Sequence, residues 1–462
     1  MKIAFVANNQ KAAFFARIGK QISLLNSDID VFYICFRNEE AKMYRGYTKD
    51  DKHILLLSYF SVKQSLPIGE YKLNELISRD RFMKYEYGKN FTFLTNMQSL
   101  FAKYLIDNDI SYVFGEMTHA PEILMSRICK DKFPGKCYYL HPQSIRIPNG
   151  RFTFMDSEFQ DDIFNAAKLF HPEDVLTEYD IPLKPIVPQR VADVAADVKN
   201  KMKLSKSFIR VLKVLTINNF TRHEEKEYFR TIPRKCARRN AFRYEKNKLY
   251  YKYWLKTADW EEIEGKKYVF VTLHMQPEAS VDVVARYYDN QLQNIINLWN
   301  ILPPDTYIVV KEHTNAIANR GYDFFHKLKS LNNVIIANEN ISSHLLLNHS
   351  IAVFTGSGTV ALEAALYKKH SLLYSHIFFD MIKYCHVITL EDIKYCKSLS
   401  GLIEDCIHRD CGKMDIEEYS KYIIRSSFKG IVDPHNDSPL FTDENNINQI
   451  ANSFVLFLNG KK

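Results

Sequence analysis

Short apolar runs alternate with longer stretches of helical periodicity over residues 1–185. The runs have the length of buried strands, and they read "KIAFVA", "IDVFYICF", "SYVFGE" and "KCYYLHP". Strands that alternate with helices are typical of a parallel sheet covered by helices. The first 185 residues are therefore predicted to form a Rossmann-like α/β domain.

The same alternation returns over residues 263–430. Five strand candidates are present, "KKYVFVTLH", "TYIVVKEH", "NVIIAN", "SIAVFTG" and "HSLLYS". Helical patterns separate them at residues 287–300, 321–330, 342–348 and 360–367. This half is predicted to be a second Rossmann-like domain.

The last segment, residues 431–462, carries one more helical pattern. Four apolar residues share one face of it, and Thr442 is placed to cap its start: Ile447, Ile450, Phe454 and Leu458. We expect this helix to cross back and pack on the first domain. The chain of 462 residues, 46% of them hydrophobic and 25% charged, is long enough for two domains with substantial cores.

Residues 186–262 differ from both halves in charge. From Lys199 to Lys256 there are 18 Lys and Arg and four Glu, so this stretch carries more excess positive charge than the net +8 of the whole chain. Phe, Tyr and Trp are interleaved with the cations. We predict a basic helical insert that meets an anionic membrane surface, with a solvated insert as the alternative. The same composition would also suit binding of nucleic acid, but no nucleic-acid partner is expected.

No apolar run approaches the roughly 18 residues of a membrane span. The eight cysteines follow no repeating framework, and the start "MKIAFVANNQ" fits a buried strand better than a signal peptide. A cytoplasmic protein, with at most peripheral contact to the inner face of a membrane, is therefore expected. The triplet Asp28-Ile29-Asp30 precedes its strand candidate instead of following it, so no metal site is expected there.

Polar residues follow three strand candidates of the second half where those strands end. Ligands of open α/β sheets bind beyond the carboxyl ends of the strands, so chemistry is expected at these positions. The residues are His274, Gln276 and Glu278, then Lys311, Glu312, His313 and Thr314, and then Thr355, Gly356, Ser357, Gly358 and Thr359.

The turn "TGSGT", residues 355–359, joins a strand candidate to a helical pattern. Glycines at such a turn let backbone N–H groups approach an anion, and the hydroxyls of Ser357 and Thr359 add donors. The turn is neither a G-x-G-x-x-G nor a Walker loop. Phosphate binding and a mere tight turn both remain open.

A resemblance to a known family rests on three ordered segments: "LHMQPEAS", "VVKEHTNAIANRGYDFF" and "NVIIANENISSHLLLNHSIAVFTGSGTVALEAALYKKHSLLYS". They resemble the capsule polysaccharide synthesis family of bacterial glycosyltransferases, which includes β-Kdo transferases and transferases of other ulosonic acids. The likeness is strong over residues 268–375, fair over "GEMTHAPE" and "RIPNGRFTFMDSEF", and absent from the basic insert. It implies a GT-B fold of two Rossmann-like domains facing across a cleft, with the nucleotide sugar held mainly by the second.

The resemblance also implies a reaction. Kdo, or a nonulosonic acid such as pseudaminic or legionaminic acid, would move from a CMP-sugar donor to a capsule or lipopolysaccharide glycan, without a further cofactor. Two other enzymes on the same scaffold stay open as alternatives, a teichoic-acid-type glycerophosphotransferase and a sugar-nucleotide epimerase. A non-enzymatic module that binds nucleic acid is a further alternative, but it leaves the three ordered segments unexplained.

The resemblance also implies roles for single residues. His313 falls on the histidine of the family's Lys-x-His-Pro motif, which meets the nucleotide's phosphate, although Thr314 replaces the proline. The "TGSGT" turn falls on a Thr-Gly-Thr-type loop, and Ser280 stands where some Kdo transferases carry Asp. The nucleotide-sugar site is accordingly expected to consist of Gln276, Lys311, His313, Thr355, Gly356, Ser357, Gly358, Thr359 and Glu363.

Glycosyl transfer also needs a base near the acceptor hydroxyl. Glu278 and, from the first half, Glu116 are the candidate bases, and His313 with Lys311 is expected to stabilise the departing phosphate. His119 and His141 also lie near strand ends, where core or rim histidines are common. Arg146 and Arg151 are candidates for meeting an acidic sugar, with a surface loop as the alternative.

Overall fold

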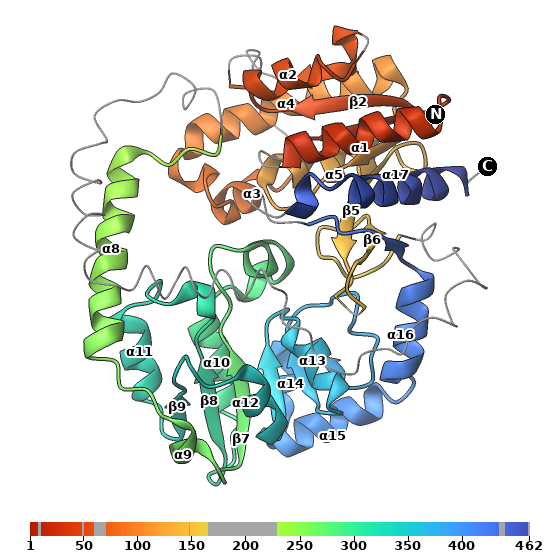
Figure 1. The fold of residues 1–462 in the computed structure, drawn as a ribbon. Helices are drawn as coiled ribbons and strands as arrows, with labels where there is room; N and C mark the ends of the chain where they lie inside the picture. The colour runs from red at the N-terminus through yellow and green to blue at the C-terminus, as the bar shows by residue number, and fades with distance from the viewer. Residues whose placement is uncertain are drawn as a thin grey trace. The chain divides into compact units, whose positions relative to one another are not determined.

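The computed structural model describes residues 1–7, 11–48, 50–59, 71–146, 148–164, 229–433 and 439–460. These residues form two compact units, each with its own sheet (Figure 1). The first unit takes the described residues up to 164, residues 229–233 and those from Ser420 onward, and the second takes Arg234–Tyr419. The predicted class, an α/β chain with two Rossmann-like sheets, is confirmed.

The sheet of the first unit runs in the order β13-β6-β5-β4-β1-β2-β3. The four strands predicted from apolar runs are present and pair in parallel. They are β1 (Lys2–Val6), β2 (Asp30–Cys35), β4 (Tyr112–Phe114) and β5 (Tyr138–Ser144). The order reverses between β1 and β4, which places a topological switch point at their carboxyl ends.

Three strands of this sheet were not predicted. β3 (Ile54–Leu56) adds to β2 in parallel, and β6 (Arg151–Met155) and β13 (Phe428–Lys429) extend the other edge in antiparallel fashion. Arg151 is buried there, and its guanidinium donates to the Ser427 hydroxyl at 2.9 Å and to the carbonyl of Ser427 at 2.7 Å. The suggestion that Arg151 meets an acidic sugar is therefore wrong. Arg146 is exposed, with a φ of 70°.

Helices cover both faces of the first sheet (Figure 1). They are α1 (Ala12–Leu25), α2 (Asn38–Tyr44), α3 (Leu73–Arg79), α4 (Tyr87–Asn108), α5 (Ala120–Lys132) and α17 (Glu444–Asn459). α17 lies beside α1, as predicted, and buries Ile447, Ile450, Phe454 and Leu458. Its cap is Asp443, whose carboxylate accepts from the Asn445 N–H at 3.1 Å, and not Thr442.

Aromatic rings hold α17 on the sheet. The ring of Phe454 lies 4.7 Å from that of Phe114 in β4, and the ring of Phe457 lies 4.4 Å from that of Phe154 in β6. Packed aromatic pairs add about 0.5–1.5 kcal/mol each beyond the apolar area that they bury. α17 is thus an integral part of the first unit.

The sheet of the second unit is parallel throughout, in the order β12-β11-β10-β7-β8-β9. Its five predicted strands are confirmed as β7 (Tyr268–Thr272), β8 (Tyr307–Lys311), β9 (Val334–Ile336), β10 (Ala352–Thr355) and β11 (Ser371–Leu373). β12 (Cys385–Val387) was not predicted. The strand order reverses between β7 and β10, so the switch point lies at their carboxyl ends.

The four predicted helices of this unit are also present: α10 (Gln291–Trp299), α11 (Tyr322–Lys329), α12 (Ser343–His349) and α13 (Val360–Leu366). α10 starts later than expected because a π-helical turn, Ser280–Val284, and a 3-10 turn, Arg286–Tyr288, occupy the residues before it. The unit also contains α8 (Arg234–Tyr253), α9 (Trp260–Ile263), α14 (Leu390–Tyr395) and α15 (Leu399–Arg409), and α16 (Ile416–Arg425) spans the division between the units.

The described part of the basic insert is α8 and the residues next to it. Tyr251 and Leu255 are buried in the core of the second unit, and the Asn247 side chain donates to the carbonyl of Asn319 at 3.1 Å. Residues 186–228 of the insert lie outside the described residues.

Candidate functional site

The switch point of the second unit is organised by His274, two residues beyond β7. Its Nε2 atom lies 2.9 Å from the Thr355 hydroxyl at the end of β10 and accepts the backbone N–H of Gly356 at 3.3 Å. The Thr355 hydroxyl oxygen in turn accepts the N–H of Gly358 at 3.2 Å, so its own proton is directed to His274. One imidazole thus ties the end of β7 to the glycine turn.

The protonation state of His274 follows from these contacts. Burial lowers the pKa of His274 to about 4, and the charges of His313 and Arg320 act in the same direction. A neutral ring that accepts at Nε2 carries its proton on Nδ1. His274 was noticed in the sequence only as one of several polar residues, and its bond to the turn depends on the packing of two distant strands.

The glycine turn uses its donors within the protein. The N–H groups of Gly356 and Gly358 are bonded as described, and the Ser357 hydroxyl donates to the carbonyl of Ser280 at 2.6 Å. A Cβ atom on Gly358 would stand 2.6 Å from the Thr355 hydroxyl oxygen, so this position requires glycine. These N–H and hydroxyl groups are therefore explained by the tight turn, without a bound phosphate. Of the five turn residues, only Thr359 is exposed.

His313 lies two residues beyond β8. Its Nδ1 atom accepts the backbone N–H of Asn315 at 3.1 Å, so the neutral ring carries its proton on Nε2 and presents that N–H as a donor. Burial lowers the pKa of His313, Glu278 opposes this, and Arg320 and Lys311 add to it. The ring is therefore neutral at pH 7 and lies within the electrostatic reach of all three groups.

Arg320 joins the ends of β7 and β8. Its guanidinium donates to the Glu312 carboxylate and to the carbonyl of His274, each at 2.6 Å. Glu312 is buried and Arg320 is half-buried. Burial raises the pKa of Glu312, and the charge of Arg320 lowers it in part. We did not identify Arg320 from the sequence, although it lies in "TNAIANRGYDFF", because no strand ends near it.

Lys311 points to the segment before α12. Its ammonium donates to the carbonyl of Ile341 and to the Ser343 hydroxyl, 3.1 Å away. Burial lowers the pKa of Lys311 to about 8 against the attraction of Glu339. The next residue, His344, has Nδ1 3.8 Å from the Glu363 carboxylate of α13. Lys311 and Glu363, both predicted to bind the nucleotide sugar, thus lie near the first two residues of α12.

Gln276 and Glu278 have different surroundings. The Gln276 amide donates to Asp282 at 3.2 Å and accepts from Gln291 at 3.1 Å, and Gln291 also accepts the N–H of His274 at 2.7 Å. Gln276 therefore positions the loop after β7. Glu278 is half-buried, accepts from the Ser280 hydroxyl at 3.1 Å and raises the pKa of His313 electrostatically.

The first unit has a polar cluster at its own switch point. Glu116, two residues beyond β4, is ion-paired with Lys11, whose ammonium also donates to the carbonyl of Val432 at 3.1 Å. Burial alone would raise the pKa of Glu116, but Lys11 and His141 lower it to about 2. Such a carboxylate is a weak base at pH 7.

Two buried histidines complete this cluster. His119 lies 3.2 Å from the Asp80 carboxylate, which also accepts the N–H of Ala120 at 2.9 Å, as in a satisfied core histidine. His141 differs, because its buried Nδ1 has no hydrogen-bond partner among the residues that the structure describes. Burial lowers the pKa of each to about 4, so both rings are neutral at pH 7.

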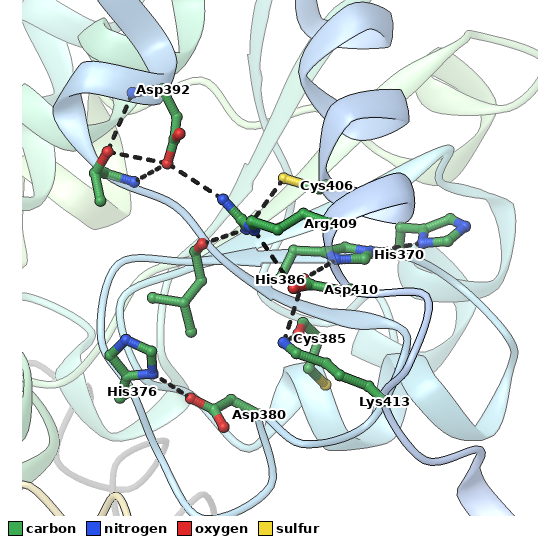
Figure 2. A network of polar contacts seen from close by, with 12 residues as sticks. His370, His376, Asp380, Cys385, His386, Asp392, Cys406, Arg409, Asp410 and Lys413 are labelled. Atoms are coloured by element: carbon green, nitrogen blue, oxygen red, sulfur yellow. Dashed lines mark hydrogen bonds and ion pairs between the residues drawn. The ribbon is translucent and has the colours of Figure 1, made fainter.

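A separate polar network lies at the β12 edge of the second sheet (Figure 2). His386 in β12 bonds to Asp410 through Nδ1 at 2.7 Å and to Nδ1 of His370 through Nε2 at 2.9 Å. Lys413 lies 3.2 Å from the same carboxylate. His370 precedes β11, so this network lies away from the carboxyl ends of β7, β8 and β10.

Among the described residues, no three metal-ligating side chains converge, and no helix is long and apolar enough to cross a membrane. No family model and no curated protein matches the chain.

Solved structures do match it. A UDP-GlcNAc 2-epimerase from Methanocaldococcus jannaschii is 13% identical, with 92% of this chain and 99% of that chain covered and a TM-score of 0.26. The β-Kdo 2,7 transferase KpsC of Thermosulfurimonas dismutans is 13% identical over 71% and 88% of the two chains, with a TM-score of 0.30. S. aureus MnaA, solved with UDP, is 10% identical over 99% and 96%, with a TM-score of 0.26. At such identities and TM-scores, these likenesses do not distinguish one reaction from another.

Proposed function

We propose that the chain is a glycosyltransferase that takes an ulosonic acid from a CMP-sugar and transfers it to a capsule or lipopolysaccharide glycan. The observation that carries this proposal is the Nε2–H of His313, held as a donor by the Asn315 N–H at the carboxyl end of β8. A preorganised N–H at this position stabilises the negative charge that develops on a departing phosphate.

Several cations and N–H groups at this edge of the second sheet are already bonded within the protein, and this favours a monophosphate leaving group. Arg320 is bonded to Glu312 and the carbonyl of His274, and Lys311 to Ile341 and Ser343. The N–H groups of Gly356 and Gly358 are bonded to His274 and Thr355. A departing nucleoside diphosphate carries more negative charge than a monophosphate and would need more cationic donors than these. CMP leaves with one phosphate, which His313 and the nearby positive charges suit.

In the proposed step, the bond between the anomeric carbon and the phosphate oxygen of CMP breaks, and a bond from the acceptor hydroxyl oxygen to that carbon forms. The acceptor's proton passes to Glu278, the half-buried carboxylate whose charge acts on His313. CMP leaves with the bonding electron pair, and its phosphate accepts the N–H of His313. Glu116 is the weaker candidate for the base, because its pair with Lys11 lowers its pKa.

A sugar-nucleotide epimerase is the second candidate. The Lys11 pair makes Glu116 a poor base for an acceptor hydroxyl, and an epimerase requires no acceptor. The two are separated by following release of free CMP from a CMP-ulosonic acid with and without a glycan acceptor. The proposal predicts release that depends on the acceptor, together with a longer glycan. Turnover of a nucleotide sugar that is independent of any acceptor would favour the epimerase.

We further propose that the acceptor is carried by lipid, so that the enzyme works at an anionic membrane surface. The basic composition of residues 199–256 supports this.

A further inference from the structure

One face of α8 is exposed and combines cations with large apolar side chains. Six exposed residues recur every three or four positions and therefore lie on one side of the helix: Lys235, Arg239, Phe242, Lys246, Leu249 and Tyr253. The exposed fractions of Phe242, Leu249 and Tyr253 are 47%, 40% and 53%. We call these six residues the outer face of α8.

The opposite side of α8 packs on the second unit. Asn247 and Tyr251 lie one turn apart there, and the ring of Tyr251 meets that of Phe325 in α11 at 6.0 Å. The only acidic residue of the helix, Glu245, is buried and lies 3.6 Å from the buried ammonium of Lys248. The outer face therefore carries positive charge with no carboxylate of α8 beside it.

We propose that the outer face of α8 docks the protein on an anionic lipid bilayer, with the helix axis parallel to the surface. The three cations would meet lipid phosphates, and the three apolar side chains between them would enter the boundary between headgroups and acyl chains. Trp254, which follows the helix and is 65% exposed, suits the same interfacial depth. A polyanion such as a glycan or a nucleic acid would use the cations but gives no role to exposed Phe242 and Leu249.

Binding to vesicles tests this without any nucleotide sugar, so the result is independent of the proposed transferase activity. The full chain should float with vesicles of equal parts phosphatidylglycerol and phosphatidylcholine at low salt. It should not float with vesicles of pure phosphatidylcholine, nor with the anionic vesicles at high salt. Replacing the cations (Lys235→Gln, Arg239→Gln, Lys246→Gln) should lower the partition coefficient roughly a hundredfold, because each well-placed cation contributes about fivefold.

The apolar residues separate a bilayer from a polyanion. The variant Phe242→Ser, Leu249→Ser, Tyr253→Ser should lose vesicle binding at least about tenfold while keeping its full charge. A matched control with exposed lysines of the first unit, Lys20→Gln, Lys84→Gln and Lys103→Gln, should bind as the unchanged chain does. Circular dichroism checks that each variant is folded. The inference is overturned if the folded apolar variant binds undiminished, if the control loses as much as the cation variant, or if the unchanged chain ignores anionic vesicles at low salt.

Discussion

The ring of His313 accepts the backbone N–H of Asn315 at 3.1 Å through Nδ1, and this contact decides which edge of the imidazole donates. The main chain after β8 thereby fixes the tautomer before any ligand arrives. A donor that is already oriented needs little reorganisation energy when charge develops on a phosphate. Such preorganised groups therefore lower reaction barriers.

Removing this donor should slow transfer without unfolding the chain. We expect His313→Ala to lower kcat by roughly tenfold to a thousandfold, as the loss of one oxyanion-type donor does, and His313→Gln to lose less because its amide N–H reaches a similar position. The exposed His326→Ala is the matched control and should keep its rate. Equal activity of folded His313→Ala and the unchanged enzyme would remove His313 from the mechanism.

The two candidate bases should respond differently to loss of charge. Glu278→Gln should lower kcat by at least about a hundredfold with little change in donor affinity, since it removes a proton acceptor used only in the chemical step. Glu116→Gln should instead lower the stability, because it leaves the Lys11 ammonium without its partner carboxylate. Steady-state kinetics together with urea unfolding of both variants measure the two effects. The reverse pattern would make Glu116 the base.

The Arg320–Glu312 pair is expected to stabilise the second unit only while both partners are present. Arg320→Met should lower the free energy of unfolding by about 3–5 kcal/mol, because it leaves a buried carboxylate uncompensated. The double variant Arg320→Met, Glu312→Gln should recover much of this loss. The exposed pair of Arg45 and Asp51 is the control, and Arg45→Met should cost less than about 1 kcal/mol. Additive losses in the double variant would contradict this coupling.

The network around His386 predicts that stability falls in acid (Figure 2). Burial lowers the pKa of His386 to about 4, even though Asp410 opposes this. The unfolded chain, with its histidine pKa near about 6.5, binds the proton first, so the stability contribution is complete above that pH and declines as pH falls toward 4. His274, His119 and His141 act with the same sign.

Thermal unfolding over this pH range measures the effect. His386→Gln removes one titrating group, so its stability should decline less steeply with acid than that of the unchanged chain. Exposed His349→Gln should leave the slope as it is. If His386→Gln shows the same slope as the unchanged chain, the contribution assigned to His386 is wrong.

The sequence predicted those parts of the fold whose signal is local. β7, β8 and β10 are apolar runs of four or five residues, and polar residues after each run marked the edge of the sheet where His274, His313 and Thr355 lie. Four strands were missed. β3, β12 and β13 have two or three residues, too few to show an apolar pattern, and β6 has five, of which Arg151 and Thr153 are polar. Their positions in the sheets are set by hydrogen bonding to neighbouring strands.

The contacts of the site required the three-dimensional structure. "TGSGT" suggested backbone N–H groups open to a phosphate, but Gly356 and Gly358 bond to His274 and Thr355, which are brought together only when β7 and β10 pair. Lys311 likewise ends a strand, where a phosphate-binding lysine would be expected, yet its ammonium donates to the carbonyl of Ile341. Arg320 acts on residues 8 and 46 positions earlier, a distance at which no sequence pattern is visible.

Protection against thermal unfolding tests the donor assignment most directly, because it needs neither an acceptor nor turnover. The account predicts that a CMP-ulosonic acid raises the Tm of the unchanged chain, since a ligand at a hundred times its Kd adds about 2.7 kcal/mol, and that UDP- and GDP-sugars raise it much less. In His313→Ala the CMP-sugar shift should shrink, while the Tm without ligand stays the same. A full shift in His313→Ala, or protection by a UDP-sugar with none by the CMP-sugar, would contradict the proposed site and donor.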